Sequence, residues 1–314
     1  MTALHDALAE YVALRRALGT QLREPAVSLE HFVELLDREG AEFITTELAL
    51  RWARQPAAAQ PATWARRLSM VRGFAAWLSL FDPRTEVPPR GVLEARHRRK
   101  KPHIFTDQEI EQLMAAASRL HSPTGLRART YATLIGLLAA TGLRPGEALA
   151  LNVSDVDLQH GILAIRQTKF GKSRFVPIED STRAALVLYA QQRDTLCPRR
   201  RTGAFLVAEQ GTRLQGCTAR RTFARLSRTI GLRKPASAAS TFRGPRLQDF
   251  RHTFATRRLL EWYRTAPDVG REIPKLATYL GHVEVGLTYW YIEGVPELLQ
   301  LAAERLGAQQ RGGV

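Results

Sequence analysis

Apolar residues recur at helical spacing over the first fifty residues of the chain. Steps of three and four residues predict a first amphipathic helix along Leu4, Leu8, Tyr11, Leu14 and Leu18. Ser28 is a suitable N-cap for a second helix, which we expect to end at Gly40. Either Thr45 or Thr46 is suited to cap a third helix.

The fourth helix has the strongest pattern. Its apolar face runs from Trp64 to Leu78, and Pro83 stops the pattern. Basic side chains occupy its other faces, at Arg66, Arg67 and Arg72. Residues 1–95 are therefore expected to form a bundle of four short helices, the last of which is basic.

A run of prolines and basic residues then interrupts the helical pattern, beginning at Pro88 and Pro89. We interpret residues 96–104 as a linker, whose basic residues include Arg98, Arg99, Lys100 and Lys101. A basic run is most often a solvated segment. Contact with a phosphate backbone is the alternative, because Lys and Arg neutralise phosphates. The sequence leaves both interpretations open.

A second domain begins after this linker. Thr106 and Glu109 form a capping box that opens a helix to about Ser118. A long apolar helix follows from Ala128 to Thr141 and ends at Gly142. Another helix begins directly afterwards, with a proline in its first turn.

Two strands and several later helices complete this domain, residues 105–314. The strands are expected over 162–167 and 174–178, and residues 168–172 join them in a hairpin. Later helices are expected at about 181–194, 217–230, 248–264 and 295–306. The predicted fold class is mainly α, because the second domain is mostly helical with only a small antiparallel sheet.

Charge distinguishes this chain from an average globular protein. Its 314 residues carry 46 Lys and Arg against 30 Asp and Glu, a net charge of +16. The net charge is −5 over residues 1–50, +8 over 51–100 and +13 over 101–314. Such polarisation is typical of a one-sided nucleic-acid footprint. All but six of the basic residues are arginine, a bias that a genome rich in G and C would also produce.

Composition excludes several other classes of protein. Hydrophobic residues make up 45% of the chain, so packed cores are expected and disorder is not. The longest apolar stretch, Tyr131–Thr141, is about half as long as a bilayer span requires, and no signal peptide is read. Cys197 and Cys217 are too few for a disulfide framework or a cysteine-built zinc site. We expect a cytoplasmic protein with no membrane association.

Four segments of the chain combine into one pattern. Arg144 follows a glycine turn, Lys169 lies at the tip of the expected hairpin, and Arg251 lies in a later helix. His282 precedes Tyr291 by nine residues. The four segments are, in chain order, Ala140–Leu149, Thr168–Pro177, Gln248–Thr256 and Tyr279–Tyr291. Taken in this order and spacing, they resemble the signature of the tyrosine recombinases, the phage integrase family.

The resemblance covers both domains and implies their roles. Trp64–Trp77 looks like the last helix of the family's core-binding domain. By this resemblance, residues 1–95 form a SAM-like, DNA-binding core-binding domain and residues 105–314 form the catalytic domain. The two would close as a C-shaped clamp on duplex DNA, with the basic linker crossing it.

The resemblance also implies a mechanism without a cofactor. Displacement at a phosphodiester without a metal needs a nucleophile, cationic groups on the non-bridging oxygens and an acid for the leaving oxygen. Tyr291 would attack the phosphate and form a 3′-phosphotyrosyl link. Arg144 and Arg251 would grip the phosphate oxygens, because guanidinium groups match them in a fixed plane. Lys169 would protonate the leaving 5′-oxygen, and His282 would hydrogen-bond the phosphate.

Neighbouring residues offer alternatives for two of these roles. Lys172 lies in the same turn as Lys169, but the family spacing favours Lys169. Tyr289 lies beside Tyr291, but the nine-residue offset from the histidine favours Tyr291. We interpret His252 as a packing residue rather than a catalytic one.

Supporting and DNA-binding residues are also expected. Glu147 lies one helical turn after Arg144 and is placed to orient a catalytic arginine. The candidate DNA-binding residues are Arg66, Arg67, Arg72, Arg98, Arg99, Lys100, Lys101, Lys172 and Arg174.

One position departs from the family pattern. Three residues before the second arginine the family usually has histidine, and this chain has Gln248. A glutamine donates and accepts hydrogen bonds, but it cannot take up a proton near neutral pH. General acid–base help is typically worth ~10²–10⁴-fold in rate. Either the base is supplied elsewhere, by a water or by His282, or the enzyme is slow or partner-dependent.

The family resemblance implies an assembly as well. Four protomers on two sites would exchange strands through a Holliday junction, with companion recombinases as an open question. A terminal helix at 296–306 is suited to pack either on its own domain or on a neighbouring protomer. Two alternative functions remain: a recombinase-like DNA-binding protein with weak cleavage, and a type IB topoisomerase. Some segments favour a transposon-borne member of the family.

Overall fold

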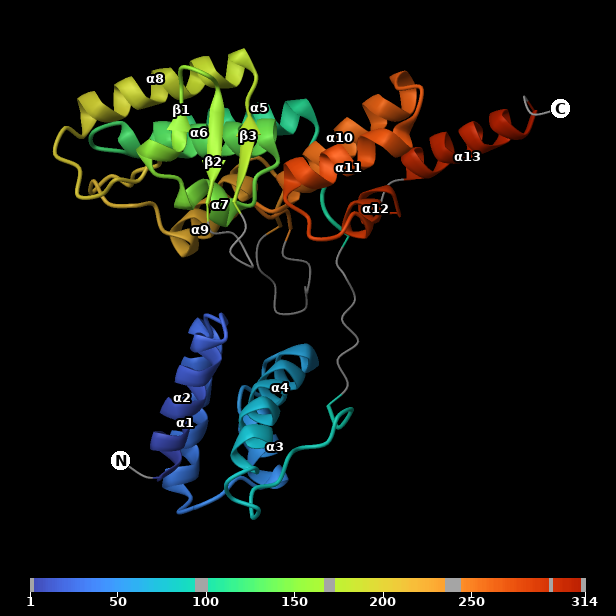
Figure 1. The fold of residues 1–314 in the computed structure, drawn as a ribbon. Coiled ribbons are helices and arrows are strands. Elements are labelled where there is room, and N and C mark those ends of the chain that lie inside the picture. Colours follow the sequence, from blue (N-terminus) through green and yellow to red (C-terminus); the bar gives the residue numbers. More distant parts are fainter. Residues whose placement is uncertain (1–2, 94–100, 167–172, 235–243, 294–295, 312–314) are drawn as a thin grey trace. The chain divides into compact units, whose positions relative to one another are not determined.

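The computed structural model describes residues 3–93, 101–166, 173–234, 244–293 and 296–311 (Figure 1). The chain divides into two compact units, Met1–Lys100 and Lys101–Val314. The division falls within the expected linker, while the DNA-binding and catalytic roles of the units stay predictions. Within the described ranges, no helix is both long and apolar enough to cross a membrane.

The first unit is a bundle of four helices: α1 Ala3–Ala17, α2 Arg23–Arg38, α3 Thr46–Arg54 and α4 Pro61–Leu78. Phe32 and Trp52 are fully buried between α2 and α3, with ring centroids 5.3 Å apart. The Thr45 hydroxyl accepts a hydrogen bond from the N–H of Leu48 and caps α3, as expected. The unit therefore has its own aromatic core.

The start predicted for the second helix, with Ser28 as N-cap, was wrong. The helix begins at Arg23, and Ser28 lies inside it. Pro25 falls in the first turn, where a missing N–H costs nothing because the first N–H groups have no intrahelical partner. The preceding Leu22 has a φ of 42° and turns the chain without a side-chain cap.

The second unit is mostly helical and contains one small sheet. Its elements are α5 Asp107–Ser118, α6 Leu126–Thr141, α7 Pro145–Ala150, the 3₁₀ turn η1 Val153–Asp155, β1 Val156–Asp157, β2 Ile162–Ile165, β3 Arg174–Pro177, α8 Asp180–Leu196, α9 Gly216–Thr229, α10 Asp249–Thr265, α11 Val269–Leu280, α12 Gly286–Glu293 and α13 Pro296–Arg311. The predicted mainly helical fold class is confirmed.

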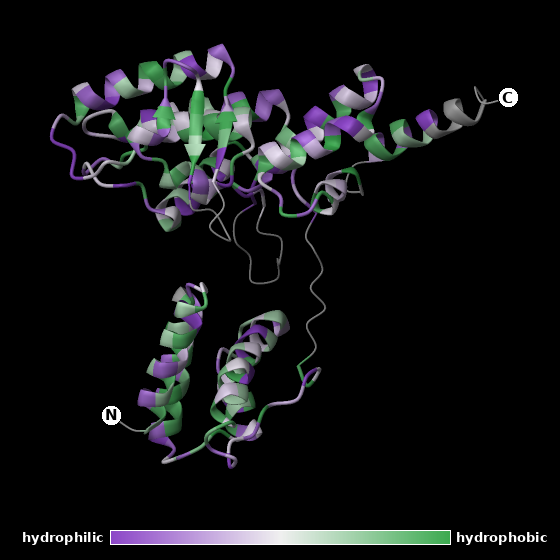
Figure 2. Cartoon of the chain, viewed as in Figure 1, coloured by the Kyte–Doolittle hydropathy of each residue, from purple (hydrophilic) through white to green (hydrophobic). Residues whose placement is uncertain are grey.

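The sheet and the long apolar helix organise this unit. The strands are antiparallel in the order β1-β2-β3, with Leu163 opposite both Val156 and Val176. Helix α6 packs against α5, α8 and α10, which explains why nearly every face of it is apolar. Figure 2 shows the alternating hydrophobic and hydrophilic stripes of α8, which buries only one face. Phe105 stacks on Phe250 at 4.3 Å between ring centroids.

Two helices near the C-terminus were missed from the sequence. Helix α11 contains Pro274 in its interior, which disguises the helical pattern. Helix α12 has only eight residues, too few to establish a periodic pattern. The turn between them begins at Gly281, whose φ of 69° ends α11.

The terminal helix α13 packs on its own domain. The side chain of Leu298 is fully buried with residues of α10 and α11. Arg305 donates hydrogen bonds to the carbonyls of Tyr263 at 2.9 Å and Ala266 at 2.7 Å, at the end of α10. Cationic donors at a helix C-terminus are favourable because the last carbonyls lack partners. Of the two arrangements that the sequence left open, the structure therefore has the one in which this helix packs on its own domain.

Candidate active site

A glycine turn sets the position of Arg144. Gly142 ends α6 with a φ of 61°, and a Cβ there would lie 2.6 Å from Cδ1 of Phe254. Only glycine fits both the conformation and the close approach of α10. Arg144 follows as the N-cap of α7, with Pro145 in the first turn. The turn thus brings Arg144 next to α10, which carries Arg251.

One carboxylate supports two arginines at this point. Arg144 donates to Glu147 from Nη1 at 2.8 Å and from its backbone N–H at 3.0 Å. Arg174 of β3 donates to the same carboxylate from both terminal nitrogens, at 3.1 and 2.9 Å. The side chain of Glu147 is 8% exposed. Burial alone raises the pKa of Glu147, but hydrogen bonds and charge from Arg174 and Arg144 outweigh it and lower the pKa.

Arg251 is almost completely buried, with 2% of its surface exposed. Its guanidinium donates to the carbonyls of Gly142 at 3.1 Å and Leu280 at 2.6 Å. A buried charge needs such partners because its hydration is lost. Burial lowers the pKa of Arg251, neighbouring Tyr291 raises it and neighbouring Arg144 lowers it. The Arg251 guanidinium therefore lies near both the Tyr291 side chain and the Arg144 guanidinium.

Tyr291 is held between two histidine rings. Its side chain is 6% exposed, on α12. The ring of His282 stacks on it at 5.8 Å between centroids, and the ring of His252 meets it edge-on at 5.2 Å. His252 also meets Trp290 edge-on at 4.8 Å, so it fills the space between α10 and α12. Nδ1 of His282 is 2.7 Å from the hydroxyl of Thr288.

Both histidines are neutral at pH 7. Burial, together with the positive charges of Arg251, Arg144 and Arg174, lowers the pKa of His282 to about 4. Burial also lowers the pKa of His252 to about 4. Tyr291 is therefore flanked by two histidine rings that carry no charge.

Gln248 precedes α10 and is half-buried. It is the N-cap residue of α10 and lies about one helical turn before His252. Its carbonyl accepts a hydrogen bond from the N–H of Arg251 at 3.2 Å. Gln248 therefore lies at the start of the helix that carries Arg251, and its role at the site stays a prediction.

Several expected site residues fall outside the described residues. These are Lys169, Lys172, Arg98, Arg99 and Lys100. Their roles stay predictions from the sequence.

Other expected DNA-binding residues are engaged within the protein. Arg66 forms an ion pair with a glutamate of α2. The Arg67 guanidinium covers the Trp52 ring at 3.6 Å, and Arg72 donates to the carbonyls of residues 88–89. Lys101 is exposed. Arg174 is 12% exposed and bound by Glu147, as described above. DNA contact by these five basic residues stays a prediction.

The sequence interpretation missed a basic face on α9. Its exposed arginines are Arg220, Arg221, Arg225 and Arg228, and among the described residues none of them has an acidic partner. Their positions fall on one side of an α-helix at 100° per residue. That spacing was available in the sequence and would have identified them.

Comparison with known proteins decides the family. The profile of the Phage integrase family matches residues 103–296. The integrase/recombinase y4rB of Sinorhizobium fredii (strain NBRC 101917 / NGR234) is 44% identical over 98% of both chains. The chain belongs to the phage integrase family. The tyrosine recombinase XerD of Caulobacter vibrioides (strain ATCC 19089 / CIP 103742 / CB 15) is 34% identical over 74% of this chain and 70% of its own. The expectation of a tyrosine recombinase, and thus of an enzyme, is confirmed.

Solved structures of this integrase family share the fold. The Tn1549 transposon integrase in complex with transposon right end DNA has a TM-score of 0.63 at 15% identity, over 98% of this chain and all of that one. The XerH recombinase bound to its difH substrate has a TM-score of 0.60 at 17% identity, over 89% of this chain and 77% of that one. At these identities, the likeness shows a common fold.

Proposed function

We propose that this integrase-family chain breaks and rejoins duplex DNA at specific sites through Tyr291. The observation that carries the proposal is the position of Arg251, whose guanidinium neighbours both Tyr291 of α12 and Arg144 at the start of α7. Two guanidinium groups beside a phenol hydroxyl match the charge that develops when a phosphodiester is attacked.

The reaction we propose conserves the energy of the phosphodiester bond. The Tyr291 oxygen forms a bond to phosphorus, the bond from phosphorus to the 5′-oxygen breaks, and a 3′-phosphotyrosyl link remains. We assign to Lys169 the donation of a proton to the 5′-oxygen, which leaves as a hydroxyl. The 5′-hydroxyl of another strand then attacks the link and releases Tyr291. Arg144 and Arg251 hold the non-bridging oxygens throughout.

The proton of the Tyr291 hydroxyl needs an acceptor other than Gln248. His282 stacks on the tyrosine ring and is neutral at pH 7, so one ring nitrogen has a lone pair. Because burial and the arginines lower the pKa of His282 and so disfavour its protonation, we assign the proton to a water beside it. Glu147 acts as a positioning residue, because its carboxylate fixes Arg144.

We propose duplex DNA as partner and a homotetramer on paired sites as the working assembly, inside the cytoplasm. Support comes from family members of the same fold: lambda integrase has been solved as a dimer on a core site and as a tetramer on a Holliday junction. A requirement for companion recombinases and a transposon-borne origin stay predictions.

A nicked suicide duplex tests the proposal. The substrate is built from the end sequences of the DNA that carries this gene, and its nick lets the 5′-hydroxyl strand diffuse away. We expect a covalent protein–DNA adduct that disappears in Tyr291→Phe, while DNA binding persists. Binding without any adduct would favour the DNA-binding alternative. Relaxation of plasmids without site preference would favour a type IB topoisomerase.

A further inference from the structure

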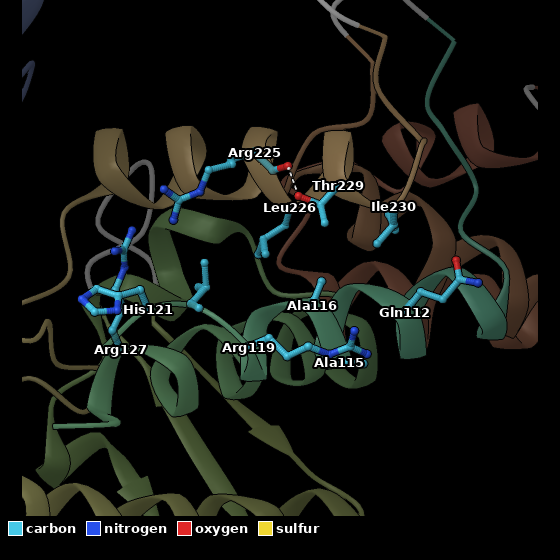
Figure 3. Close-up of a pocket in the computed structure, with 11 residues that line it drawn as sticks. Gln112, Ala115, Ala116, Arg119, His121, Arg127, Arg225, Leu226, Thr229 and Ile230 are labelled. Carbon is cyan, nitrogen blue, oxygen red and sulfur yellow. Dashed lines mark hydrogen bonds between the residues drawn. The ribbon is translucent and has the colours of Figure 1, made fainter. Parts of the chain in front are cut away.

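A cavity of about 760 Å³ lies between α5 and α9 of the second unit. Figure 3 shows its lining side chains coming from α5, the segment that follows it, the start of α6 and the second half of α9. Four of these side chains are cationic or titratable bases: Arg119, His121, Arg127 and Arg225. None of the described residues that line it is acidic. The proposed catalytic residues do not line it.

The arginines of this cavity differ from those of the domain that form ion pairs. Arg257 and Arg258, for example, form ion pairs with Asp107 and Glu179. Among the residues that the structure describes, Arg119 and Arg225 are exposed and have no acidic partner. Like charges gathered without a counter-charge repel one another, and a bound anion removes that repulsion.

The carboxylate beside the cavity, that of Glu209, is already hydrogen-bonded to groups of the protein. Glu209 accepts hydrogen bonds from the hydroxyls of Ser122 and Thr124, both at 2.6 Å, and from the backbone N–H of Arg127 at 2.9 Å. Burial alone raises the pKa of Glu209, but these hydrogen bonds lower it to about 2. Its charge is therefore used to fix the turn before α6 rather than to neutralise the arginines.

Helix α9 connects this cavity with the proposed active site. At one end, Gly216 lies against Leu149 of α7, the helix that begins after Arg144. The second half of α9 packs on α5 at the cavity. Figure 1 shows α7 and α9 along one edge of the second unit, with α8 along the opposite edge. The exposed arginines of α9 extend the positive surface along this edge.

The length of α9 gives an approximate distance between its contact with α7 and the cavity. Fourteen residues span about 20 Å of helix. Successive phosphates along a strand of duplex DNA rise about 3.4 Å, so this distance corresponds to roughly six base pairs. If the strand whose phosphate reacts at Arg144 and Arg251 runs along α9, other phosphates of the same duplex come within reach of the cavity.

We propose that this cavity binds the phosphodiester backbone of the duplex that flanks the reacting phosphate, with Arg119 and Arg225 as its ligands. The proposal rests on the proposed function and adds a second anchoring point for the DNA. Guanidinium groups bind phosphate oxygens through two parallel hydrogen bonds. Such contacts fix the position of the duplex and are independent of base sequence.

The first test is the salt dependence of DNA binding by the full-length chain. The variant Arg119→Gln/Arg225→Gln removes both ligands, and Arg129→Gln/Arg183→Gln is a charge-matched control. Arg129 contacts Gln192 of α8, and Arg183 pairs with Asp180 on that helix, at the opposite edge. Each phosphate contact contributes about 0.9 to the slope of log affinity against log salt, so the slope should flatten by about 2 in the cavity variant. The control should keep the wild-type slope.

The second test locates the phosphates. Three consecutive neutral methylphosphonate linkages are placed in successive windows on each side of the mapped cleavage site. A window about six base pairs away should weaken binding by wild-type protein and leave the cavity variant unaffected, because its ligands are already absent. Equal weakening of both proteins in every window would overturn the proposal.

The remaining outcomes separate this proposal from the proposed function. A wild-type chain that binds no duplex would refute the proposed function itself. Binding with an unchanged slope in the cavity variant overturns the phosphate site alone. If the cavity variant instead loses self-association without DNA while keeping the wild-type slope, the cavity binds an acidic protein segment and the proposal is wrong.

Discussion

Arg174 binds Glu147 with both ends of its guanidinium, at 3.1 and 2.9 Å, while the same carboxylate holds Arg144. A residue of the hairpin strand is thereby joined to the helix that carries a proposed catalytic arginine. Arg174 approaches Gly281 so closely that a Cβ there would lie 2.8 Å from its Nη1, and Nη2 of Arg144 donates to the Gly281 carbonyl at 3.5 Å. The ion-pair network therefore packs against the residue that precedes His282.

Glu147→Gln should separate the positioning role from DNA binding. The neutral amide leaves the nearly buried guanidinium of Arg174 and the partly exposed one of Arg144 without their charge partner, and breaking a buried pair costs about 3–5 kcal/mol of stability. We expect a lower thermal midpoint and a single-turnover cleavage rate reduced by at least tenfold, with DNA affinity changed less than threefold. A variant with normal cleavage and weakened DNA binding would contradict the positioning role.

Arg174→Gln distinguishes a structural arginine from a DNA ligand. If Arg174 acts through Glu147, the cleavage rate falls while the dissociation constant and its salt dependence stay unchanged. If it contacts a phosphate, affinity falls and the salt slope flattens by about 1. Binding titrations at four salt concentrations, with Arg183→Gln as control, decide between them. The burial of Arg174 predicts the first result.

Gln248→His should accelerate cleavage. The substitution places a titratable imidazole at the position where the family pattern has one, and general acid–base help is typically worth ~10²–10⁴-fold. We expect at least a tenfold higher single-turnover rate near pH 7.5, and Gln248→Asn serves as the control without a base. An unchanged rate in Gln248→His would mean that the proton already has an efficient acceptor.

His252 should act through its shape. His252→Phe keeps a ring between Trp290 and Tyr291, whereas His252→Ala removes it. A displacement of about 1 Å at a reacting group can cost about 100-fold in rate. We therefore expect cleavage by the Phe variant within threefold of wild type and a loss of at least tenfold in the Ala variant. A loss in both variants, with normal folding by circular dichroism, would assign a role to the ring nitrogens.

The two neutral histidines predict a pH dependence of stability. In the unfolded chain each imidazole has its ordinary pKa near 6.5, and in the folded chain burial lowers the pKa of both to about 4. Between these values the unfolded state binds more protons, so the free energy of unfolding falls as pH drops from 6.5 toward 4. His252→Phe should show a shallower loss of thermal midpoint between pH 7 and pH 5 than wild type. Parallel profiles would contradict the lowered pKa of His252.

Local sequence signals identified most of the fold. The sequence correctly predicted caps and turns that only a few residue types can form. These are the Thr106–Glu109 capping box, the cap at Thr45, one of the two candidates, and the Gly142 turn. Helix α11 was missed because Pro274 in its interior usually indicates a break, and here the neighbouring turns tolerate it. Tertiary packing, which a local pattern does not contain, decides such cases.

The candidate site was predicted as a set of residues, without its geometry. Spacing placed Arg144, Arg251 and Tyr291 in one family pattern, and the structure has Arg251 near both of the others. The flanking of Tyr291 by two neutral histidines could not be read from the sequence, because it depends on how α12 docks against α10. The same holds for the bidentate contact between Arg174 and Glu147.

Identification of the covalently linked residue tests the central claim most directly. The adduct formed on the suicide duplex is digested with nuclease and protease, and mass spectrometry locates the nucleotide on the peptide that spans residues 272–305. The account predicts a 3′-phosphoryl group on Tyr291. A link to Tyr289 or to any other residue, or a link through a 5′-phosphate, would contradict it.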